Sequence, residues 1–330
     1  MNVKVLTSPE AFDPLKRVWN DLLQRSTINT IFNTWQWQET WWRCFGEDRK
    51  LRLCLVYEGR QLLGIVPLVG LEGDPTAQTL QLVGGTDVAD YLDVIAEPVH
   101  VPAVWAAVLD TVEWRTLDLH ALPEASPTRP VLARLAAERG YDFVENVEDV
   151  CPLFQLPKTW DDYLALLGKK NRHELRRKMR RLEQEAEVRM RVTHDIAALA
   201  DDVDDFITLH RSSEGRKGRF MDARMTEFFH ALARVCFMEK WLHLAFLDIN
   251  GRLAATTLSF KYNNTLALYN SAYSLRFQRY SPGVLLVAYI IREAIASGIQ
   301  TFDFMRGDER YKYDLGGQDT RVMHLVLSRA

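Results

Sequence analysis

The sequence contains no long apolar run. Its longest uninterrupted apolar stretch, residues 284–291, stops at Arg292 after eight residues, whereas a membrane-spanning helix needs about 20. The amino terminus also lacks the basic start and apolar segment of a secretory signal. We therefore expect no membrane insertion and a cytoplasmic location.

Cysteine is scarce, with four residues in a chain of 330. They form no C-x-x-C pair and follow none of the Cys/His spacings of zinc sites. In so long a chain this usage is typical of reduced thiols that fill the core. We expect no disulfide framework and no bound metal.

The common catalytic motifs are missing. The chain has no G-x-S-x-G, H-E-x-x-H, G-x-G-x-x-G or Walker lysine motif. These absences remove the usual signatures of serine hydrolases, metalloproteases, dinucleotide-binding enzymes and nucleoside triphosphatases.

The composition is that of an ordinary globular protein, with 47% hydrophobic and 26% charged residues. The length favours two domains, which we expect at residues 1–150 and 151–330. The net charge of −3 divides into −9 for the first half and +6 for the second. Anionic ligands should therefore favour the second half.

Apolar periodicity predicts that strands and helices alternate in both halves. In the first half we expect strands at 51–57, 62–69, 79–83, 91–95 and 116–120, and helices at 14–24, 101–112 and 130–138. In the second half we expect helices at 169–186, 196–212, 224–237 and 282–297, and strands at 150–156, 242–249, 253–262, 265–273, 301–304 and 322–327.

The helix predicted after residue 168 is strongly basic. Residues 169–181 contain eight Lys or Arg and one acidic residue, while Leu175, Met179, Leu182 and Ala186 line an apolar face. The cations fit a solvated face that balances the acidic first half, a small phosphate ligand, or an RNA backbone. No aromatic residues interleave to stack bases.

Residues 273–286 lead from a strand through a basic loop into a helix that begins near Pro282. A helix amino terminus offers unpaired N–H groups and the positive end of its dipole. Arg276, Arg279 and Ser281 add donors, so the segment could hold a phosphate. An ordinary serine cap followed by proline is the structural alternative.

The segment 301–319 delivers polar residues past the end of a strand. Phe302 and Phe304 alternate with Asp303, and a glycine-containing loop with Asp308, Tyr311 and Lys312 follows. Sites are common in such loops, although a solvated turn with incidental ion pairs fits the same pattern.

Two further segments are candidates for the substrate site. Residues 32–42 are crowded with aromatics, including Trp35 and Trp37, which fit either a core or the wall of an apolar groove. The basic, glycine-containing segment 210–222, with His210 and Arg216, is typical of a mobile substrate loop.

Taken together, these motifs resemble the CelD/BcsL-type (BioF2-like) acetyltransferases of the GNAT superfamily. The resemblance extends over nearly the whole chain. It rests on residues 32–42, 64–68, 170–182, 210–222, 281–286 and 302–313.

The resemblance implies an α+β fold with two tandem GNAT domains, each a mixed sheet flanked by helices, similar to the Fem peptidyltransferases that use aminoacyl-tRNA. In GNAT enzymes the acyl-CoA pyrophosphate lies on a Q/R-x-x-G-x-G/A turn. The matching stretch here is 279–284, with Pro282 and Val284 where the pattern has glycine and a small residue. By similarity to Fem enzymes, Lys312 is placed at the donor site.

We therefore expect an N-acyltransferase that moves an acyl group from acyl-CoA, chiefly acetyl-CoA, to an amine of a small molecule or a sugar or polysaccharide precursor. The alternatives are an aminoacyl-tRNA-dependent transferase and a non-catalytic GNAT scaffold in polysaccharide assembly. The expected catalytic residues are Asp303, Asp308, Tyr311, Lys312 and Tyr273. Donor binding is expected at Arg276, Arg279, Ser281, Gly283, Val284 and Leu285, and acceptor binding at Trp35, Trp37, Arg172, Arg176, His210 and Arg216.

Overall fold

The computed structural model describes residues 1–74, 76, 78–213 and 216–329. The chain folds into two compact units: unit 1 comprises Met1–Val150 with Thr320–Ala330, and unit 2 comprises Cys151–Asp319. The sequence-based boundary assigned all of 151–330 to the second domain. The last residues instead join unit 1 because the carboxy-terminal strand pairs with a strand of that unit.

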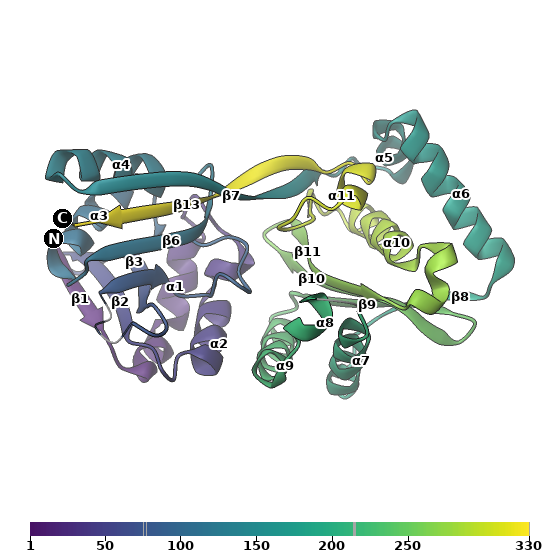
Figure 1. Cartoon of the computed structure of the whole chain (residues 1–330), viewed down its shortest axis with the longest axis horizontal. Coiled ribbons are helices and arrows are strands. Elements are labelled where there is room, and N and C mark those ends of the chain that lie inside the picture. Colours follow the sequence, from purple (N-terminus) through teal and green to yellow (C-terminus); the bar gives the residue numbers. More distant parts are fainter. Residues whose placement is uncertain (75, 77, 214–215, 330) are drawn as a thin grey trace. The chain divides into compact units, whose positions relative to one another are not determined.

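Unit 1 is built on a mixed sheet in the order β1-β2-β3-β4-β6-β13, with β5 paired to β3 (Figure 1). The strands are β1 (Asn2–Leu6), β2 (Leu51–Glu58), β3 (Gln61–Gly70), β4 (Thr79–Leu82), β5 (Ile95–Ala96), β6 (Thr116–Pro123) and β13 (Gln318–Ser328). The helices are η1 (Pro9–Leu15), α1 (Lys16–Leu23), η2 (Ile31–Asn33), α2 (Trp35–Phe45), α3 (Val101–Thr111) and α4 (Thr128–Arg139).

The strand predicted at 91–95 is mostly irregular, and β5 contains only Ile95 and Ala96. The backbone N–H of Asp93 donates to the Asn33 side chain, and that of Val94 donates to the Asp93 carboxylate. Because side chains take these N–H groups, they are not available for a strand ladder.

Unit 2 has the sheet order β7-β12-β11-β10-β9-β8. Its strands are β7 (Asp142–Gln155), which starts in unit 1, β8 (Val188–Val192), β9 (Leu242–Ile249), β10 (Arg252–Tyr262), β11 (Thr265–Tyr273) and β12 (Thr301–Asp303). Its helices are α5 (Trp160–Leu166), α6 (Lys169–Glu185), α7 (Leu199–Arg211), α8 (Arg216–Phe220), α9 (Ala223–Met238), η3 (Leu275–Tyr280), α10 (Pro282–Ala296) and α11 (Arg310–Asp314).

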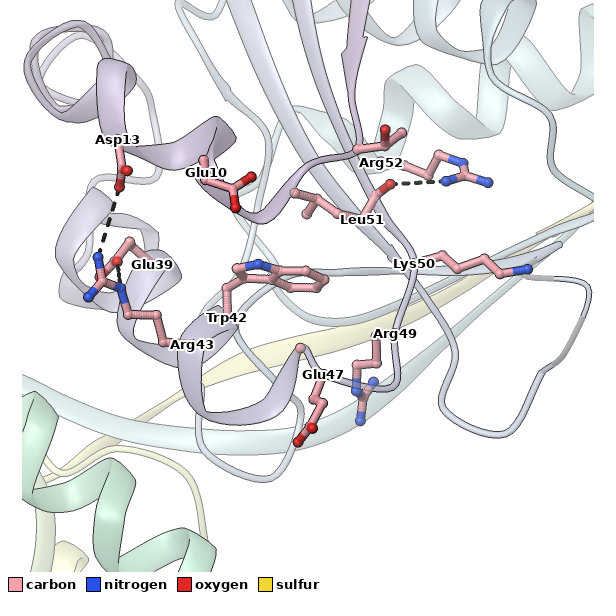
Figure 2. A pocket seen from close by; sticks show the side chains of 12 residues that line it. Glu10, Asp13, Glu39, Trp42, Arg43, Glu47, Arg49, Lys50, Leu51 and Arg52 are labelled. Carbon is pink, nitrogen blue, oxygen red and sulfur yellow. Dashed lines mark hydrogen bonds and ion pairs between the residues drawn. The ribbon is translucent and has the colours of Figure 1, made fainter.

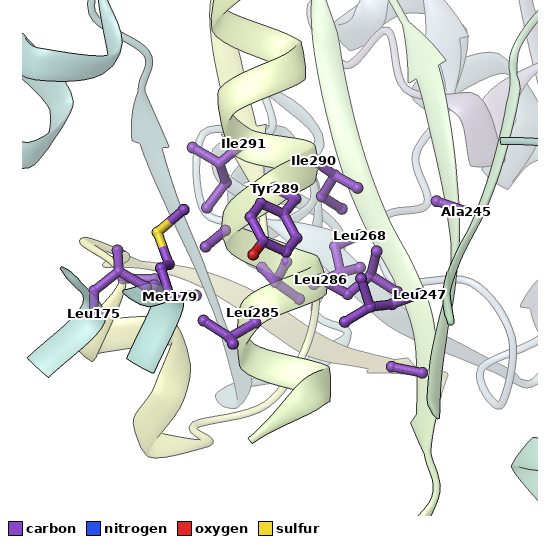
Figure 3. Packing of buried hydrophobic residues seen from close by; sticks show 14 of the residues in the cluster. Leu175, Met179, Ala245, Leu247, Leu268, Leu285, Leu286, Tyr289, Ile290 and Ile291 are labelled. Atoms are coloured by element: carbon purple, nitrogen blue, oxygen red, sulfur yellow. The ribbon is translucent and has the colours of Figure 1, made fainter. Parts of the chain in front are cut away.

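Helices cover both faces of this sheet: α7, α8 and α9 lie on one side, and α5, α6 and α10 on the other (Figure 1). The core on the second side joins the apolar face of α6 to α10 and the strands (Figure 3). Leu175, Met179 and Leu182 are buried in it, as their spacing predicts. The α+β class with mixed, helix-flanked sheets is confirmed.

Candidate functional site

The central strands of unit 2 part at the end of β12. β11 and β12 run parallel from Thr265 and Thr301 to Ala267 and Asp303, the last of their pairs in the described part of the chain. β11 itself continues to Tyr273, where it still pairs with β10. Beyond Ala267, β11 therefore pairs with β10 on one side and is separated from β12 on the other.

β11 also contains a β-bulge at this point. Its register with β10 shifts between Leu258 opposite Asn270 and Ser259 opposite Leu268, which makes Tyr269 the extra residue. A bulge bends a strand and redirects its side chains, and bulges are frequent beside active sites. The bulge therefore shapes the part of β11 that has separated from β12.

His210 forms a hydrogen bond with the side chain of Asn270, the residue that follows the bulge. Its Nε2 atom lies 3.0 Å from Asn270 Oδ1, an oxygen that only accepts, so Nε2 carries the proton. The backbone N–H of Ser271 donates to the same oxygen over 3.1 Å. Because His210 is buried in the last turn of α7, it acts on β11 from within the core instead of from an open substrate loop.

Tyr311 of α11 approaches the same strand. Burial raises the pKa of its phenol, the negative charge of Glu309 raises it further, and a hydrogen bond with Ser271 opposes the change. The net direction is upward, so the phenol stays protonated at neutral pH. Tyr311 can therefore donate a proton beside β11, but it cannot act as a base.

Lys312 and Asp303 hold the loop between β12 and α11. The Lys312 ammonium, only 2% exposed, donates to the carbonyls of Met305, Arg306 and Gly307 over 3.0, 2.7 and 3.1 Å. The buried Asp303 carboxylate accepts the N–H of Met305 over 2.8 Å. These contacts support a turn in which Met305 has a left-handed φ of 62°, a conformation costly for a residue with a side chain.

The geometry thus divides the expected catalytic residues into two groups. Asp303 and Lys312 are turned toward the backbone of their own loop, which suits a positioning role. Asp308 is exposed on that loop, and Tyr273 is 42% exposed at the end of β11. Tyr311, Tyr273 and Asp308 are therefore the members that an acyl donor or acceptor could contact.

The start of α10 differs from the expected serine cap. Ser281 adopts a left-handed φ of 53°, and its hydroxyl caps no N–H of the described first turn. Pro282 has no N–H, and the N–H of Leu285 bonds the Ser281 carbonyl over 3.1 Å. The amides of Gly283 and Val284 are left without an intrahelical acceptor.

Tyr273 packs directly on this first turn. A Cβ atom at Gly283 would lie 3.3 Å from Cδ1 of the Tyr273 ring, so glycine lets the ring approach the helix. The end of β11 and the beginning of α10 are thereby brought into contact. Leu285, expected at the donor site, is fully buried and contributes its backbone and core packing only.

Two arginines border the start of α10. The guanidinium carbon of Arg279 lies 4.4 Å from the centre of the Tyr280 ring, and that of Arg181 lies 5.8 Å from it. Arg181 also donates from Nη1 to the Arg279 carbonyl over 3.4 Å. Arg181 is not among the ligand-binding residues expected from the sequence. Spacing alone does not show which cation of α6 faces Arg279, 98 residues away.

The other cations expected to bind ligands lie in varied surroundings. Arg172 donates to the Leu164 carbonyl over 3.4 Å, which ties α6 to α5. Arg176 is exposed, and so is Arg276, whose guanidinium carbon lies 5.9 Å from the Phe277 ring centre. Arg216 begins α8, but its side chain lies outside the described part of the structure.

The two tryptophans expected at an acceptor groove differ in burial: Trp37 lies in the unit 1 core, whereas Trp35 is partly exposed. Trp37 is fully buried and packs its ring against Phe32 at a centroid distance of 4.6 Å. Trp35 donates from Nε1 to the Phe12 carbonyl over 2.7 Å. The groove assignment is therefore corrected to core packing for Trp37, while for Trp35 a role at a groove stays a prediction.

Unit 1 has an open cleft of about 660 Å³ between η1, the end of α2 and the start of β2 (Figure 2). Its lining is charged with both signs, and much of that charge is paired: Arg43 bonds Glu39 and Arg49 bonds Glu72. Trp42 forms the floor between these groups (Figure 2). The cleft could accept a polar, zwitterionic group.

The chain is similar to known proteins in the sequence of one region and in its overall fold. Residues 169–313 match a family described as "Acetyltransferase (GNAT) domain". No curated protein matches the chain in sequence. Among solved structures, FemX is similar with a TM-score of 0.68 and 10% identity, over 98% of this chain and 97% of FemX.

Two other solved structures have the same fold. L-PGS from Bacillus licheniformis is similar with a TM-score of 0.57 and 11% identity, over 95% of this chain and 91% of that one. A tandem GNAT protein from the clavulanic acid biosynthesis pathway is similar with a TM-score of 0.54 and 13% identity, over 100% and 99%. Residues 169–313 thus match the GNAT acetyltransferase domain, and the chain as a whole has a tandem GNAT fold.

Proposed function

We propose that the protein is an N-acyltransferase whose donor site lies in unit 2, with acyl-CoA, chiefly acetyl-CoA, as co-substrate. The observation that carries this proposal is the contact of the end of β11, past its last described pair with β12, with the first turn of α10, bordered by Arg181 and Arg279. Backbone groups for an acyl chain and cations for a diphosphate therefore occur side by side.

The diphosphate site would rely more on side chains than a glycine-rich turn does. With Pro282 in the first turn, Gly283 and Val284 supply the available amides. Arg181 and Arg279 add two guanidinium groups, which form stronger, charge-assisted bonds to phosphate oxygens. Guanidinium groups would thus take the place of the backbone amides of a glycine-rich turn. They support acyl-CoA binding although the sequence departs from the Q/R-x-x-G-x-G/A pattern.

For the chemical step, the attacking amine must lose a proton, and the leaving thiolate must gain one. We assign Tyr311, whose pKa is raised, as the donor to the thiolate, with the exposed Tyr273 as the alternative. Asp308 would accept the amine proton through water. A backbone N–H at the end of β11, beyond that of Ser271, which bonds Asn270, would stabilise the developing oxyanion, and Asp303 and Lys312 would keep the loop in place.

The acceptor would be an amine of a small molecule or of a sugar or polysaccharide precursor, as in the CelD/BcsL type that the motifs resemble. Unit 1 would shape the acceptor site, since its residues 1–150 carry a net charge of −9, which attracts a cationic amine.

We place this reaction in the cytoplasm. Within the described residues, no helix has both the length and the hydropathy for crossing a bilayer.

Thermal unfolding with CoA tests the donor site. At 100 times its Kd, CoA should stabilise the wild type by about 2.7 kcal/mol and raise Tm accordingly. Arg181→Ala combined with Arg279→Ala should remove most of this rise. Arg177→Ala, which removes a cation of the same helix paired with Glu174, should keep it. Equal stabilisation of all three proteins would contradict the site.

Aminoacyl-tRNA is the second candidate donor, favoured by the eight cations of residues 169–181. Binding of charged tRNA would weaken with salt, with log K falling by about 0.7 to 0.9 per log unit of salt for each phosphate contacted. Binding of tRNA with that slope, and no CoA effect, would replace acyl-CoA as the donor. Binding of neither would favour the non-catalytic scaffold.

A further inference from the structure

We propose that unit 1 contains a binding site for a divalent transition-metal ion of the Zn²⁺ type, formed by Asp118, His120 and His324. This site is independent of the acyl-donor site in unit 2. Sequence motifs do not reveal it, because His120 and His324 lie far apart in the chain and follow no zinc spacing.

Two neighbouring strands bring the three side chains together. Asp118 and His120 are two residues apart on β6 and so share a face of the sheet. β13 pairs with β6 in antiparallel register, and a shift between Met323 and Leu325 leaves His324 opposite the bulged part of β6. Within that bulge Ala121 has a left-handed φ of 58°, strained for a residue with a side chain.

The potential ligand atoms converge. Asp118 Oδ1 lies 2.6 Å from His324 Nε2 and 3.2 Å from His120 Nε2, and one ligand atom from each residue fits within a mutual distance of 4.8 Å. The two imidazole rings stack at 3.8 Å with an angle of 11° between their planes. A small tilt of these partly exposed rings would bring both nitrogen lone pairs onto one ion.

Other side chains orient the ligands as they do at metal sites. Glu148 Oε1 lies 3.2 Å from His120 Nδ1, and its Oε2 accepts the N–H of Ala121 over 2.7 Å. A proton on Nδ1 donated to Glu148 leaves Nε2 as the ligating nitrogen. Gln81 donates to Asp118 Oδ2 over 2.8 Å, which leaves Oδ1 for the ion. Carboxylate and amide partners of this kind fix ring orientation at metal centres.

The donor set selects the class of ion. Two imidazole nitrogens and one carboxylate oxygen suit Zn²⁺ and its neighbours, whereas Mg²⁺ and Ca²⁺ prefer oxygen ligands. The ion would replace the protons that now join the two Nε2 atoms to Asp118, and those protons would pass to solvent. Because the three side chains are 21–26% exposed, a fourth coordination position would remain open to water.

The test uses the full chain, purified without a histidine tag. Isothermal titration with Zn²⁺ should give one ion per chain, and Co²⁺ should produce the visible absorption of a tetrahedral site. His324→Ala and Asp118→Asn should abolish both signals. Glu148→Gln should weaken Zn²⁺ binding about 10- to 100-fold. His100→Ala, a histidine in the same unit outside the cluster, should bind like the wild type.

Circular dichroism and Tm of the metal-free variants establish that they fold, and His120→Gln replaces His324→Ala if that variant does not. Zn²⁺ should raise the Tm of the wild type and of His100→Ala but not of the folded cluster variants. Absence of Zn²⁺ and Co²⁺ binding by the wild type would overturn the proposal and leave a hydrogen-bonded cluster. Unchanged affinity in the cluster variants would overturn it as well.

Discussion

Lys312 illustrates how a residue in a candidate active site can act without touching the substrate. Its ammonium donates to three carbonyls of one turn and pairs with Glu309 at 2.9 Å. Together with Asp303, it holds Met305 in a strained conformation. Removing it would leave carbonyl groups unsatisfied in a largely buried position, so stability and activity should decline together.

We predict that Lys312→Met lowers the free energy of unfolding by about 1–3 kcal/mol, because buried acceptors lose their donor, and that turnover falls with it. Urea unfolding and a steady-state rate measurement check this.

In contrast, Tyr311→Phe should slow acyl transfer about 10²- to 10⁴-fold with a nearly unchanged Tm.

Asp303→Asn separates positioning from proton transfer. An asparagine Oδ1 can still accept the N–H of Met305, so a positioning role predicts a rate within a few-fold of the wild type. Loss of a general base would cost about 10²- to 10⁴-fold. A fall of that size in a folded Asp303→Asn protein, with an altered pH–rate profile, would make Asp303 the base.

At the scale of secondary structure, α10 is fastened to the sheet by one carboxylate. Glu293 contacts His243 Nε2 of β9 at 3.2 Å and accepts a bond from Lys261 Nζ of β10 over 3.0 Å. The hydrogen bond with His243, opposed by burial and reinforced by Lys261, lowers the pKa of Glu293 to about 2. The helix whose first turn would bind the donor is thus held near its other end.

This contact predicts a pH dependence. The pKa of Glu293 is lower in the folded state than the ordinary value of 4.5, so its stabilisation is complete above about pH 4.5 and is lost as pH falls toward about 2. Because the carboxylate is one-third exposed, we expect about 1–2 kcal/mol at pH 7. Urea unfolding of Glu293→Gln and wild type should differ at pH 7, and the difference should narrow below about pH 4.5 and largely disappear near pH 2. A constant difference would contradict the assignment.

The sequence predicted the elements better than their mutual positions. The apolar face of α6 and the strands of unit 2 follow from periodicity, which depends on nearby residues. The bulge at Tyr269, the approach of Arg181 to Arg279, and the pairing of Asp118 with His324, 206 residues apart, depend on sheet register and helix rotation. The sequence of one chain does not show either. Trp37 was ambiguous because core packing and groove walls use the same residues.

At the scale of the whole molecule, the two units share the chain in an interleaved way. β7 begins in unit 1 and ends in unit 2, and the chain returns at Thr320 to complete unit 1 with β13. This return explains why the match to a GNAT domain at 169–313 ends before the carboxy terminus. Under the two proposals, unit 2 would bind the acyl donor and unit 1 would bind a metal ion.

The central claim is that unit 2 binds the acyl donor where β11 meets α10, and hydrogen–deuterium exchange with and without acetyl-CoA tests it most directly. Saturating acetyl-CoA should slow exchange in peptides covering residues 269–273 and 281–285, while peptides from the unit 1 cleft at residues 39–52 should be unchanged. Protection confined to unit 1, or binding that leaves both segments of unit 2 unprotected, would contradict it.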